Sequence, residues 1–240
     1  MDSTTSDTPS LYLIPSTMSD APVANVIPQL NIDITRRLRH FIVENERTAR
    51  RFLKRCDRAI DIDALTFSTL NTHTLLAELP AMLEPLRQGH DMGVISEAGC
   101  PAVADPGADI VAIAQREGFR VVPLVGPSSI IMSLMASGFN GQSFAFAGYL
   151  PIDASARTAA LREMERMIQR RDQTQIFIET PYRNDRLLAE LVKTLPGHLR
   201  LCVAADITGP SQTIITRPLS QWARNPMRIS KRPCIFLLYK

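Results

Sequence analysis

The sequence from Gly93 to Gly138 places the same succession of strand, loop and helix twice in a row. A short apolar run, Met92 to Ile95, ends at a polar loop, and a helical pattern with Asp105 as its expected cap follows. A second apolar run, Phe119 to Val125, is expected to be a buried strand and leads through Gly126-Pro127-Ser128 into a second helix. Parallel strands need such helical crossovers. The stretch therefore predicts two turns that open on one edge of a parallel sheet, the edge at which such sheets bind ligands.

The rest of the chain continues this alternation of strands and helices. Further strands are expected at 11–15, 40–43, 65–70, 143–147, 174–178, 201–205, 212–216 and 234–239, and helices at 32–39, 48–55, 156–170 and 184–195, with two short helices within 74–88. The pattern predicts an α/β fold with two α/β domains and mainly parallel sheets. We expect a flexible tail over residues 1–10, a first domain over 11–126 and a second over 127–240.

Composition excludes several classes of protein. The 240 residues are 45% hydrophobic, enough for sizeable cores, but no window approaches the ~18 apolar residues of a membrane helix. The four cysteines and four histidines lack metal-ligand spacing, so reduced thiols and no metal are expected. None of the 11 glycines stands two residues from another, which argues against a phosphate-binding loop. These features favour a cytoplasmic protein without a membrane partner.

The positive charge is concentrated in two stretches. Nine basic residues and three acidic ones lie between Arg36 and Arg58, and five basic residues with no acid lie between Arg217 and Arg232. Within the first stretch, Arg47, Arg50, Arg51 and Lys54 have helical spacing and are expected on one face. Such asymmetry predicts an anionic partner, and solvated surface charge is the alternative.

Five motifs between residues 96 and 183 resemble one known family. They are SEAGCP (96–101), DPG (105–107), VVPLVGPSS (121–129), GYLP (148–151) and IFIETPYR (176–183). In this order they resemble the tetrapyrrole methylase superfamily, the class III S-adenosylmethionine (SAM) methyltransferases. Within it, the chain is most similar to the family that methylates a ribose 2′-hydroxyl of small-subunit ribosomal RNA.

The resemblance implies a cofactor, partners and a set of binding residues. SAM is expected in the cleft between two domains, ribosomal RNA or the small ribosomal subunit as the partner, and a homodimer as the assembly. The main chain of the loop from Ser96 to Gly99 is expected to hold the amino acid end of SAM. The residues implied as cofactor contacts are Ser96, Glu97, Ala98, Gly99, Val103, Ser128, Ser129, Glu179, Ile207, Thr208 and Cys234.

Two polar residues after the expected strand 40–43 are candidates for catalysis. Glu44 and Arg47 match the family at this position, and a ribose hydroxyl needs either a base to take its proton or a cation to stabilise the oxyanion. The alternative is that Glu44 only pairs with Arg47 or a neighbouring arginine as a salt bridge at the surface. Cys100 is expected to be a packing residue, because no histidine is near it in sequence.

Two other functions stay open at this point. One is a small-molecule methyltransferase of the tetrapyrrole type, which would need a pocket for an acidic metabolite instead of an extended basic face. The other is a non-catalytic relative that binds SAM or RNA. It is motivated by two departures from the family pattern: the loop from Pro15 to Asp20, which lines the cofactor in the family, lacks the glycine found near Ser19, and 44–47 reads Glu-Asn-Glu-Arg instead of Glu-Asp-Thr-Arg. The basic stretch from Arg36 to Arg58 favours RNA.

Overall fold

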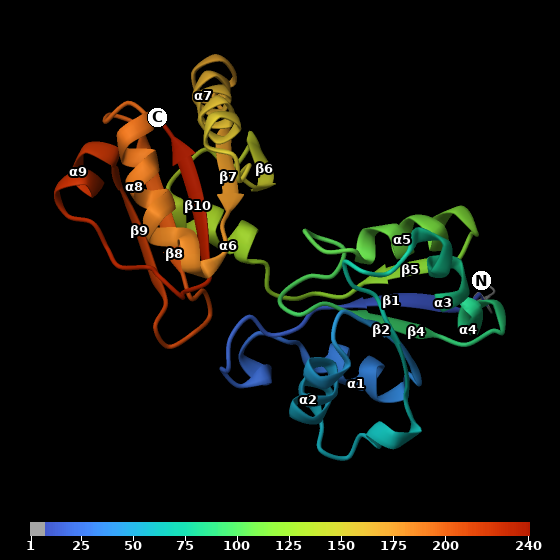
Figure 1. Ribbon diagram of the computed structural model, residues 1–240. Coiled ribbons are helices and arrows are strands. Elements are labelled where there is room, and N and C mark those ends of the chain that lie inside the picture. Colours follow the sequence, from blue (N-terminus) through green and yellow to red (C-terminus); the bar gives the residue numbers. More distant parts are fainter. Residues whose placement is uncertain (1–7) are drawn as a thin grey trace, which may run out of the picture. The chain divides into compact units, whose positions relative to one another are not determined.

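The computed structural model describes residues 8–240 and divides the chain into two compact units, one ending at Pro127 and the other running from Ser128 to Lys240. Figure 1 labels most of the helices and strands of both units. The first seven residues of the predicted tail lie outside the described residues. Each unit has its own sheet, so each is built and stabilised around its own core.

The first unit is built on a parallel sheet. Its strands are β1 (Ser10–Ile14), β2 (His40–Val43), β3 (Thr66–Thr69), β4 (Met92–Ile95) and β5 (Arg120–Pro123). Their order across the sheet is β3-β2-β4-β1-β5, and every pair is parallel. The prediction that the run around β5 is a buried strand is wrong, because β5 is an edge strand and its residues are half-buried or exposed. The carboxyl ends of these strands share one edge, as predicted.

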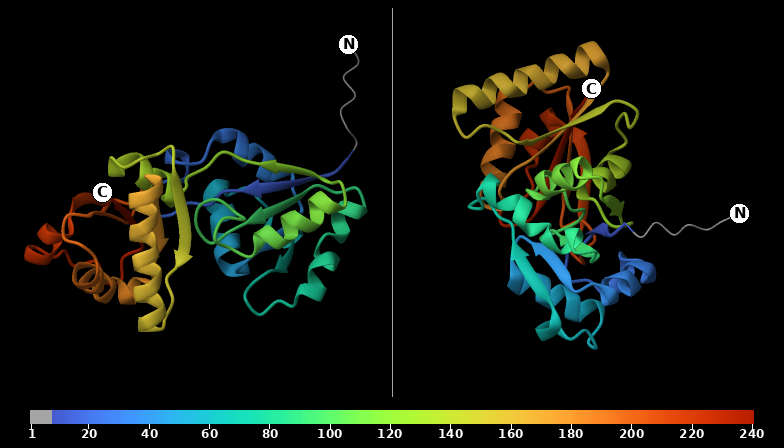
Figure 2. Two further views of the ribbon diagram at one scale, coloured as in Figure 1. Left: turned by 90° about the horizontal axis from the view of Figure 1, so that it is seen from above. Right: turned by 90° about the vertical axis from the view of Figure 1, so that its right-hand side faces the viewer.

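Helices cover both faces of this sheet, as Figures 1 and 2 show. The α-helices are α1 (Gln29–Arg37), α2 (Glu46–Cys56), α3 (Leu79–Met82), α4 (Glu84–Arg87) and α5 (Gly107–Arg116), and three 3-10 helices (Val23–Asn25, Ile62–Ala64 and Leu76–Glu78) lie in the connections. Phe41 and Val43 pack in the cluster that contains residues of α1 and α2, whereas Ile42 packs with residues of α3, α4 and α5. This alternation along β2 is the two-residue period of a strand buried on both sides.

Local sequence signals set the starts of several helices. Asn45 caps α2, because its Oδ1 accepts hydrogen bonds from the backbone N–H groups of Arg47 (3.0 Å) and Thr48 (3.2 Å). Proline at the first positions of α3 and of α4 divides the predicted 74–88 segment into short helices. Pro106 holds the cap position of α5, one residue after the predicted Asp105, whose carboxylate still accepts from the Gly107 N–H at 2.7 Å.

The second unit has a mixed sheet. Its strands are β6 (Phe144–Tyr149), β7 (Thr174–Ile178), β8 (Arg200–Ala205), β9 (Thr213–Pro218) and β10 (Cys234–Tyr239), in the order β6-β7-β10-β8-β9. β6 pairs with β7 in parallel, whereas β10 is antiparallel to β7 and β8, and β8 is antiparallel to β9. The predicted α/β class is confirmed for both units.

Helices also pack against the second sheet. They are α6 (Ser129–Ser137), α7 (Ala154–Arg171), α8 (Asn184–Thr194) and α9 (Leu219–Arg224), with a 3-10 helix at Pro181–Arg183. The main core joins Leu161, Met164 and Ile168 of α7, as predicted, to α8, α9 and one face of the sheet. Trp222 of the unpredicted helix α9 is fully buried there, and its Nε1 donates to the Leu201 carbonyl at 3.0 Å. Among the helices described, none has the length and apolarity to cross a membrane.

Candidate active site

A cavity of about 430 Å³ opens at the carboxyl edge of the first sheet. Three segments form it: the loop that follows β1, the helix α2 with its cap Asn45, and the end of β4 with the loop that follows it. Its lining residues are Ser16, Thr17, Met18, Ser19, Asp20, Asn45, Thr48, Ala49, Arg51, Phe52, Arg55, Ile95, Ser96, Glu97 and Ala98. Ser96, Glu97 and Ala98, three of the predicted cofactor contacts, therefore line a cavity at the predicted edge.

The loops after β1 and β4 are joined main chain to main chain. The Ser16 N–H donates to the Gly99 carbonyl at 2.9 Å, and the Gly99 N–H donates to the Ser16 carbonyl at 3.3 Å. Gly99 has a φ of +79°, a conformation that favours glycine, and a Cβ at this position would lie 3.2 Å from the Pro127 carbonyl oxygen. The backbone conformation at position 99 therefore requires glycine. The N–H and the carbonyl of Gly99 are both already hydrogen-bonded to Ser16.

Glu44 holds the same loop from the side of β2. Its Oε1 accepts a hydrogen bond from the Glu97 N–H at 3.0 Å. The hydroxyl of Thr48, in the first turns of α2, donates to the Glu97 carboxylate. Within residues 8–240 Glu44 forms no ion pair, so the alternative of a surface pair with Arg47 is not what the structure contains. Arg47 itself is exposed and does not line the cavity.

Burial raises the pKa of the Glu44 carboxyl above its ordinary value. The charges of Asp105 and Glu97 raise it further, while the Glu97 N–H opposes the shift. Burial also raises the pKa of Asp105, although that carboxylate accepts from the N–H groups of Gly107 and Ala102. Glu44 and Asp105 border the same small gap beside the end of β4. A carboxyl with a raised pKa can exchange a proton closer to neutral pH than an exposed one.

Arginines of α2 form the outer wall of the cavity. Arg55 donates to the Thr17 hydroxyl at 3.1 Å and to the Ala21 carbonyl at 2.6 Å, which fixes the loop after β1 against α2. Arg51 also lines the cavity. Arg50 is exposed as well, but it pairs with Glu46 at 2.6 Å and its guanidinium lies 5.4 Å from the centre of the Phe67 ring. The basic residues of this helix therefore have different neighbours and different freedom to bind a ligand.

One polar atom in the cavity wall has no partner. The Ser16 hydroxyl is buried and makes no hydrogen bond in the described structure. A buried hydroxyl without a partner costs free energy, typically ~1–3 kcal/mol, unless something that enters the cavity bonds to it. Together with the guanidinium groups of Arg51 and Arg55 and the apolar Phe52 and Ile95, this donor set fits a ligand with a carboxylate and an apolar part, as SAM has at its amino acid end.

Val103 differs from the other predicted contacts of the first unit. Half of its surface is exposed, and it lies outside the residues that line the cavity. It sits between Ala102 and Ala104, which both have positive φ angles (64° and 60°), in the loop that Asp105 stabilises. The structure therefore gives Val103 no partner at this cavity.

The predicted contacts in the second unit gather mainly at one edge of its sheet. Glu179 follows β7, Ile207 and Thr208 follow β8, and Cys234 begins β10, whose antiparallel direction puts its start beside the ends of β7 and β8. The Glu179 carboxylate is already bonded to Arg183 (2.5 Å) and to the Thr180 N–H (2.6 Å). Ile207 and Cys234 are buried, and burial raises the pKa of the Cys234 thiol to about 12.

Ser128 and Ser129 have a clear structural role. Ser128 caps α6, and its hydroxyl accepts a hydrogen bond from the Ile131 N–H at 3.4 Å. Ser129 is the first residue of that helix. Thr208 has a φ of +69°, and its N–H donates to the side chain of Gln212 at 2.9 Å. These contacts explain the local conformation, and the predicted contacts with a cofactor stay predictions.

Ser16 and Thr17 belong to the loop from Pro15 to Asp20, which the family resemblance makes a cofactor-lining loop, and both line the cavity. Arg55 was not singled out as a site residue from the sequence. It was counted only within the basic stretch from Arg36 to Arg58, and the packing of α2 against the loop after β1 shows its contact. In the described part of the chain no group of three or more metal-ligating side chains is found. The four cysteines are free thiols.

Comparison with known proteins agrees with the motifs. Residues 35–223 match the family of tetrapyrrole (corrin/porphyrin) methylases. The chain is 30% identical over 215 residues to ribosomal RNA small subunit methyltransferase I of Vibrio cholerae, a match that covers 89% of this chain and 70% of that protein. It is 33% identical over 156 residues to the Pseudomonas aeruginosa protein of the same name, covering 64% of this chain and 54% of that protein.

Solved structures share the fold at lower sequence identity. The methyltransferase CobJ has a TM-score of 0.62 with 16% identity, and the match covers 96% of this chain and 93% of that one. Uroporphyrin-III C-methyl transferase from Thermus thermophilus, solved in complex with S-adenosylhomocysteine, has a TM-score of 0.56 with 14% identity and 97% coverage of both chains. Since the family match spans most of the sequence and the fold agrees over nearly all of it, this chain belongs to the tetrapyrrole (corrin/porphyrin) methylases, a family of methyltransferases.

Proposed function

We propose that this chain transfers a methyl group from SAM to a ribose 2′-hydroxyl of small-subunit ribosomal RNA. The observation that carries the proposal is the identity of 30% with the Vibrio cholerae ribosomal RNA methyltransferase over 89% of this chain. The cavity at the carboxyl edge of the first sheet supports it, because that edge is where a ligand of such a sheet binds. The choice of the 2′-hydroxyl rests on the motif resemblance alone.

In this proposal the first unit holds the amino acid end of SAM. Bound SAM supplies a methyl group on a positively charged sulfur, which needs little further activation. The Ser16 hydroxyl and the guanidinium of Arg51 would bond to the ligand carboxylate, and the bridge between Ser16 and Gly99 would fix the cavity floor. Glu179, Ile207, Thr208 and Cys234 remain proposed contacts for the adenosine. The protein thereby contributes mainly orientation.

Glu44 is the proposed group that takes the proton of the acceptor hydroxyl. Its raised pKa suits a general base, and its hydrogen bond to the Glu97 N–H fixes its position beside the loop of the cavity. The exposed guanidinium of Arg47 would stabilise negative charge on the acceptor oxygen. The exposed basic side chains of α2 would bind the phosphates of the RNA.

A small-molecule methyltransferase is the second candidate. The observation that favours it is the fold shared with enzymes that methylate corrins and porphyrins, such as the Thermus thermophilus uroporphyrin-III enzyme. That agreement concerns fold, because identity is only 14%. The RNA methyltransferases match at twice that identity, so RNA remains the first proposal.

The test is transfer of a labelled methyl group. Purified protein is given labelled SAM with small ribosomal subunits, with free ribosomal RNA, or with an extract of small metabolites. Label in RNA, in a dinucleotide that resists alkaline cleavage, supports ribose methylation, since cleavage needs a free 2′-hydroxyl. Label only in metabolites favours the second candidate. Binding of SAM without transfer to any fraction favours a non-catalytic relative.

Two further properties belong to the same proposal. The homodimer implied by the family resemblance would give twice the monomer mass in light scattering of the purified protein. A cytoplasmic location follows from the proposed substrate, because ribosomal RNA is modified where ribosomes assemble. Fractionation of cells that express the chain checks it.

A further inference from the structure

A second cavity, of about 540 Å³, lies at the opposite edge of the first sheet. Three of the residues around it are the first residues of strands: Ser10 begins β1, His40 begins β2, and Arg120 begins β5. Ser10 and Arg120 are register partners on neighbouring strands, as are His40 and Met92. In a parallel sheet all amino ends meet at one edge, so this cavity is separated from the first one by the length of the strands, roughly 13 Å for four residues.

The wall of this cavity is rich in cationic side chains. Arg37, Arg39 and Arg120 line it, together with two histidines and a single carboxylate, Asp91. That carboxylate is engaged, because its Oδ1 accepts a hydrogen bond from the Ser10 N–H at 2.7 Å and so fixes the start of β1. Three guanidinium groups therefore face a space in which the one lining acid is already bonded.

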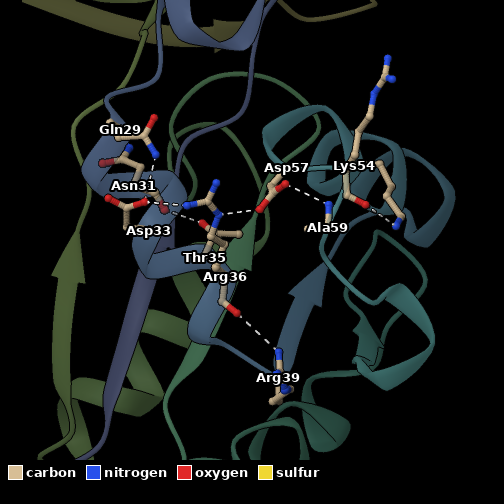
Figure 3. A network of polar contacts seen from close by, with 10 residues as sticks. Gln29, Asn31, Asp33, Thr35, Arg36, Arg39, Lys54, Asp57 and Ala59 are labelled. Atoms are coloured by element: carbon tan, nitrogen blue, oxygen red, sulfur yellow. Dashed lines mark hydrogen bonds and ion pairs between the residues drawn. The ribbon is translucent and has the colours of Figure 1, made fainter.

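The arginines of this wall differ from Arg36, which directly precedes Arg37 in sequence. Figure 3 shows Arg36 between two carboxylates, and its guanidinium is 2.6 Å from Asp57 and 3.0 Å from Asp33. Arg37 and Arg120 form no ion pair with any residue from 8 to 240, and Arg39 contacts only carbonyl oxygens, at 3.4 Å. The protein neutralises Arg36 internally, whereas the three arginines around the cavity outnumber its one lining carboxylate and form no ion pair with it.

One of the two histidines in the wall carries a buried nitrogen atom without a hydrogen-bond partner among the described residues. The His40 and His90 rings lie 5.4 Å apart, and the Nδ1 atom of His40 is buried without a hydrogen-bond partner. Burial lowers the pKa of His40, and the nearby His90 lowers it further. Each of these side chains would gain from an anion in the cavity, because an anion supplies an acceptor and a counter-charge together.

We propose that the cavity at the amino edge of the first sheet binds a phosphate group. Guanidinium groups bind phosphate oxygens through paired N–H donors, and arginines at the end of α1, just before β2 and at the start of β5 can approach one phosphate from different sides. This site is separate from the proposed SAM site and does not rest on the proposed function, because it is argued from the charges and the orphaned atom around the cavity. The phosphate has two possible sources, a small phosphorylated molecule or the backbone of a nucleic acid.

The test compares a double variant with a control of equal charge. Arg37→Gln with Arg120→Gln removes two cavity charges from exposed side chains, while Arg170→Gln with Arg171→Gln removes two exposed charges at the end of α7. Calorimetric titrations use sodium phosphate against sodium chloride of equal ionic strength, and a short oligouridylate. We expect the parent and the control to bind phosphate alike and the cavity variant to bind at least tenfold more weakly.

Each ligand distinguishes one source. Weakened binding of sodium phosphate alone assigns the site to a free phosphorylated molecule, and weakened binding of the oligouridylate assigns it to a nucleic acid backbone. Equal affinities of the cavity variant and the control for both ligands would overturn the proposal. Circular dichroism and SAM binding check that the variants are folded, and the single variant Arg120→Gln, on an edge strand, replaces the double variant if that one is unstable.

Discussion

The two edges of the first sheet carry arginines in different states. At the carboxyl edge, Arg55 is bonded to the loop after β1 and Glu44 to the loop after β4, so the polar groups of the cavity mostly hold each other. At the amino edge, Arg37 and Arg120 have no acidic partner among the described residues. The same strands thus end in a cavity of fixed shape and begin in a cavity of unbalanced charge.

This difference separates two ways of binding. A wall whose polar groups are bonded to each other loses little entropy when a ligand enters, and it selects the ligand by shape and orientation. A wall of exposed guanidiniums attracts any anion and is weakened by salt. The first suits a group-transfer reaction, and the second suits the capture of a phosphate. Substitutions at one edge, with binding measured at both, show whether the two edges are independent.

The largest expected effect is at Glu44. If it acts as a base, Glu44→Gln removes the proton acceptor but keeps an oxygen for the Glu97 N–H, so the single-turnover rate falls by ~10²-fold or more while SAM still binds. Glu44→Ala removes both functions. Single-turnover methylation at saturating RNA, with SAM affinity measured beside it, separates the two roles.

A positioning role gives the opposite pattern. Glu44→Gln would then stay within about threefold of the parent rate, less than ~1 kcal/mol in the barrier, whereas Glu44→Ala would weaken SAM binding through a displaced loop. In the parent, a base with a raised pKa also gives a rate that falls as pH is lowered through that pKa. That acidic limb should be absent from the Glu44→Gln profile.

A smaller effect is expected at the cavity floor. Ala98→Leu places a larger side chain on the loop that lines the carboxyl-edge cavity, and SAM affinity should fall by roughly tenfold or more, given that overpacking typically costs ~1–3 kcal/mol. Ala112→Leu, at an exposed position of α5, is the matched control. Calorimetry on both folded proteins decides. Equal SAM affinity would exclude the loop from the site, and altered phosphate binding in Ala98→Leu would show that the two edges are coupled.

The basic face of α2 should affect RNA binding, and Arg51, which lines the proposed SAM cavity, should affect SAM binding as well. Changing Arg50, Arg51 and Lys54 together to Gln should weaken RNA binding several-fold at moderate salt and lower the salt slope by about one for each RNA phosphate that the variant no longer neutralises. Since Arg50 is bonded to Glu46, most of the change should come from the other two residues. Fluorescence titration with RNA at several salt concentrations measures the slope. If the slope matches that of the Arg170→Gln, Arg171→Gln control, these residues are only a solvated surface.

The smallest effect concerns how the free energy of unfolding changes with pH. The direction of this change should differ between Glu44 at the carboxyl edge and His40 at the amino edge. The folded state raises the Glu44 pKa above 4.5, so the unfolded chain binds fewer protons there and stability falls as pH rises through that window. The folded state lowers the His40 pKa below 6.5, so stability rises as pH approaches 6.5 from below. Each effect should stay below the ~1.4 kcal/mol of a full unit, since solvent screens both groups.

Urea unfolding from pH 4 to 7.5 can separate these two contributions. Glu44→Gln should flatten the curve just above pH 4.5, and His40→Gln should flatten it just below pH 6.5. A change at both windows in either variant would mean that the edges are linked through the sheet. Unchanged curves in both variants would mean that other groups set the pH dependence.

Sequence reasoning located most of the strands because their apolar runs are continuous. β4, β7 and β10 begin and end at the predicted residues, since nearly every residue of these strands is buried and most of them are apolar. It missed α9, whose six residues are too few for a helical period to be visible. It made β5 a buried strand, because an apolar run does not reveal whether a second neighbouring strand is present.

The candidate site was predicted only in part, for a related reason. A motif such as the loop from Ser96 to Gly99 is local, so its place at a strand end could be inferred. The contact of Arg55 with Thr17 depends on how α2 packs against a distant loop, and the cavity of Arg37, His40 and Arg120 depends on which strands are neighbours. The strand order and the packing of the helices decide these contacts. A count of charged residues along the sequence gives no information about either.

The bridge between Ser16 and Gly99 has a consequence for how such a protein can evolve. Two loops that are fastened through their peptide groups keep their spacing when side chains are exchanged, so mutations can accumulate on the cavity wall without moving its floor. Ser19, in the first of these loops, is one position where this lineage carries a residue other than glycine. Gly99 is different, because its left-handed backbone admits few replacements. Related proteins with other specificities should therefore differ in the side chains of the cavity wall and keep glycine at the position of Gly99.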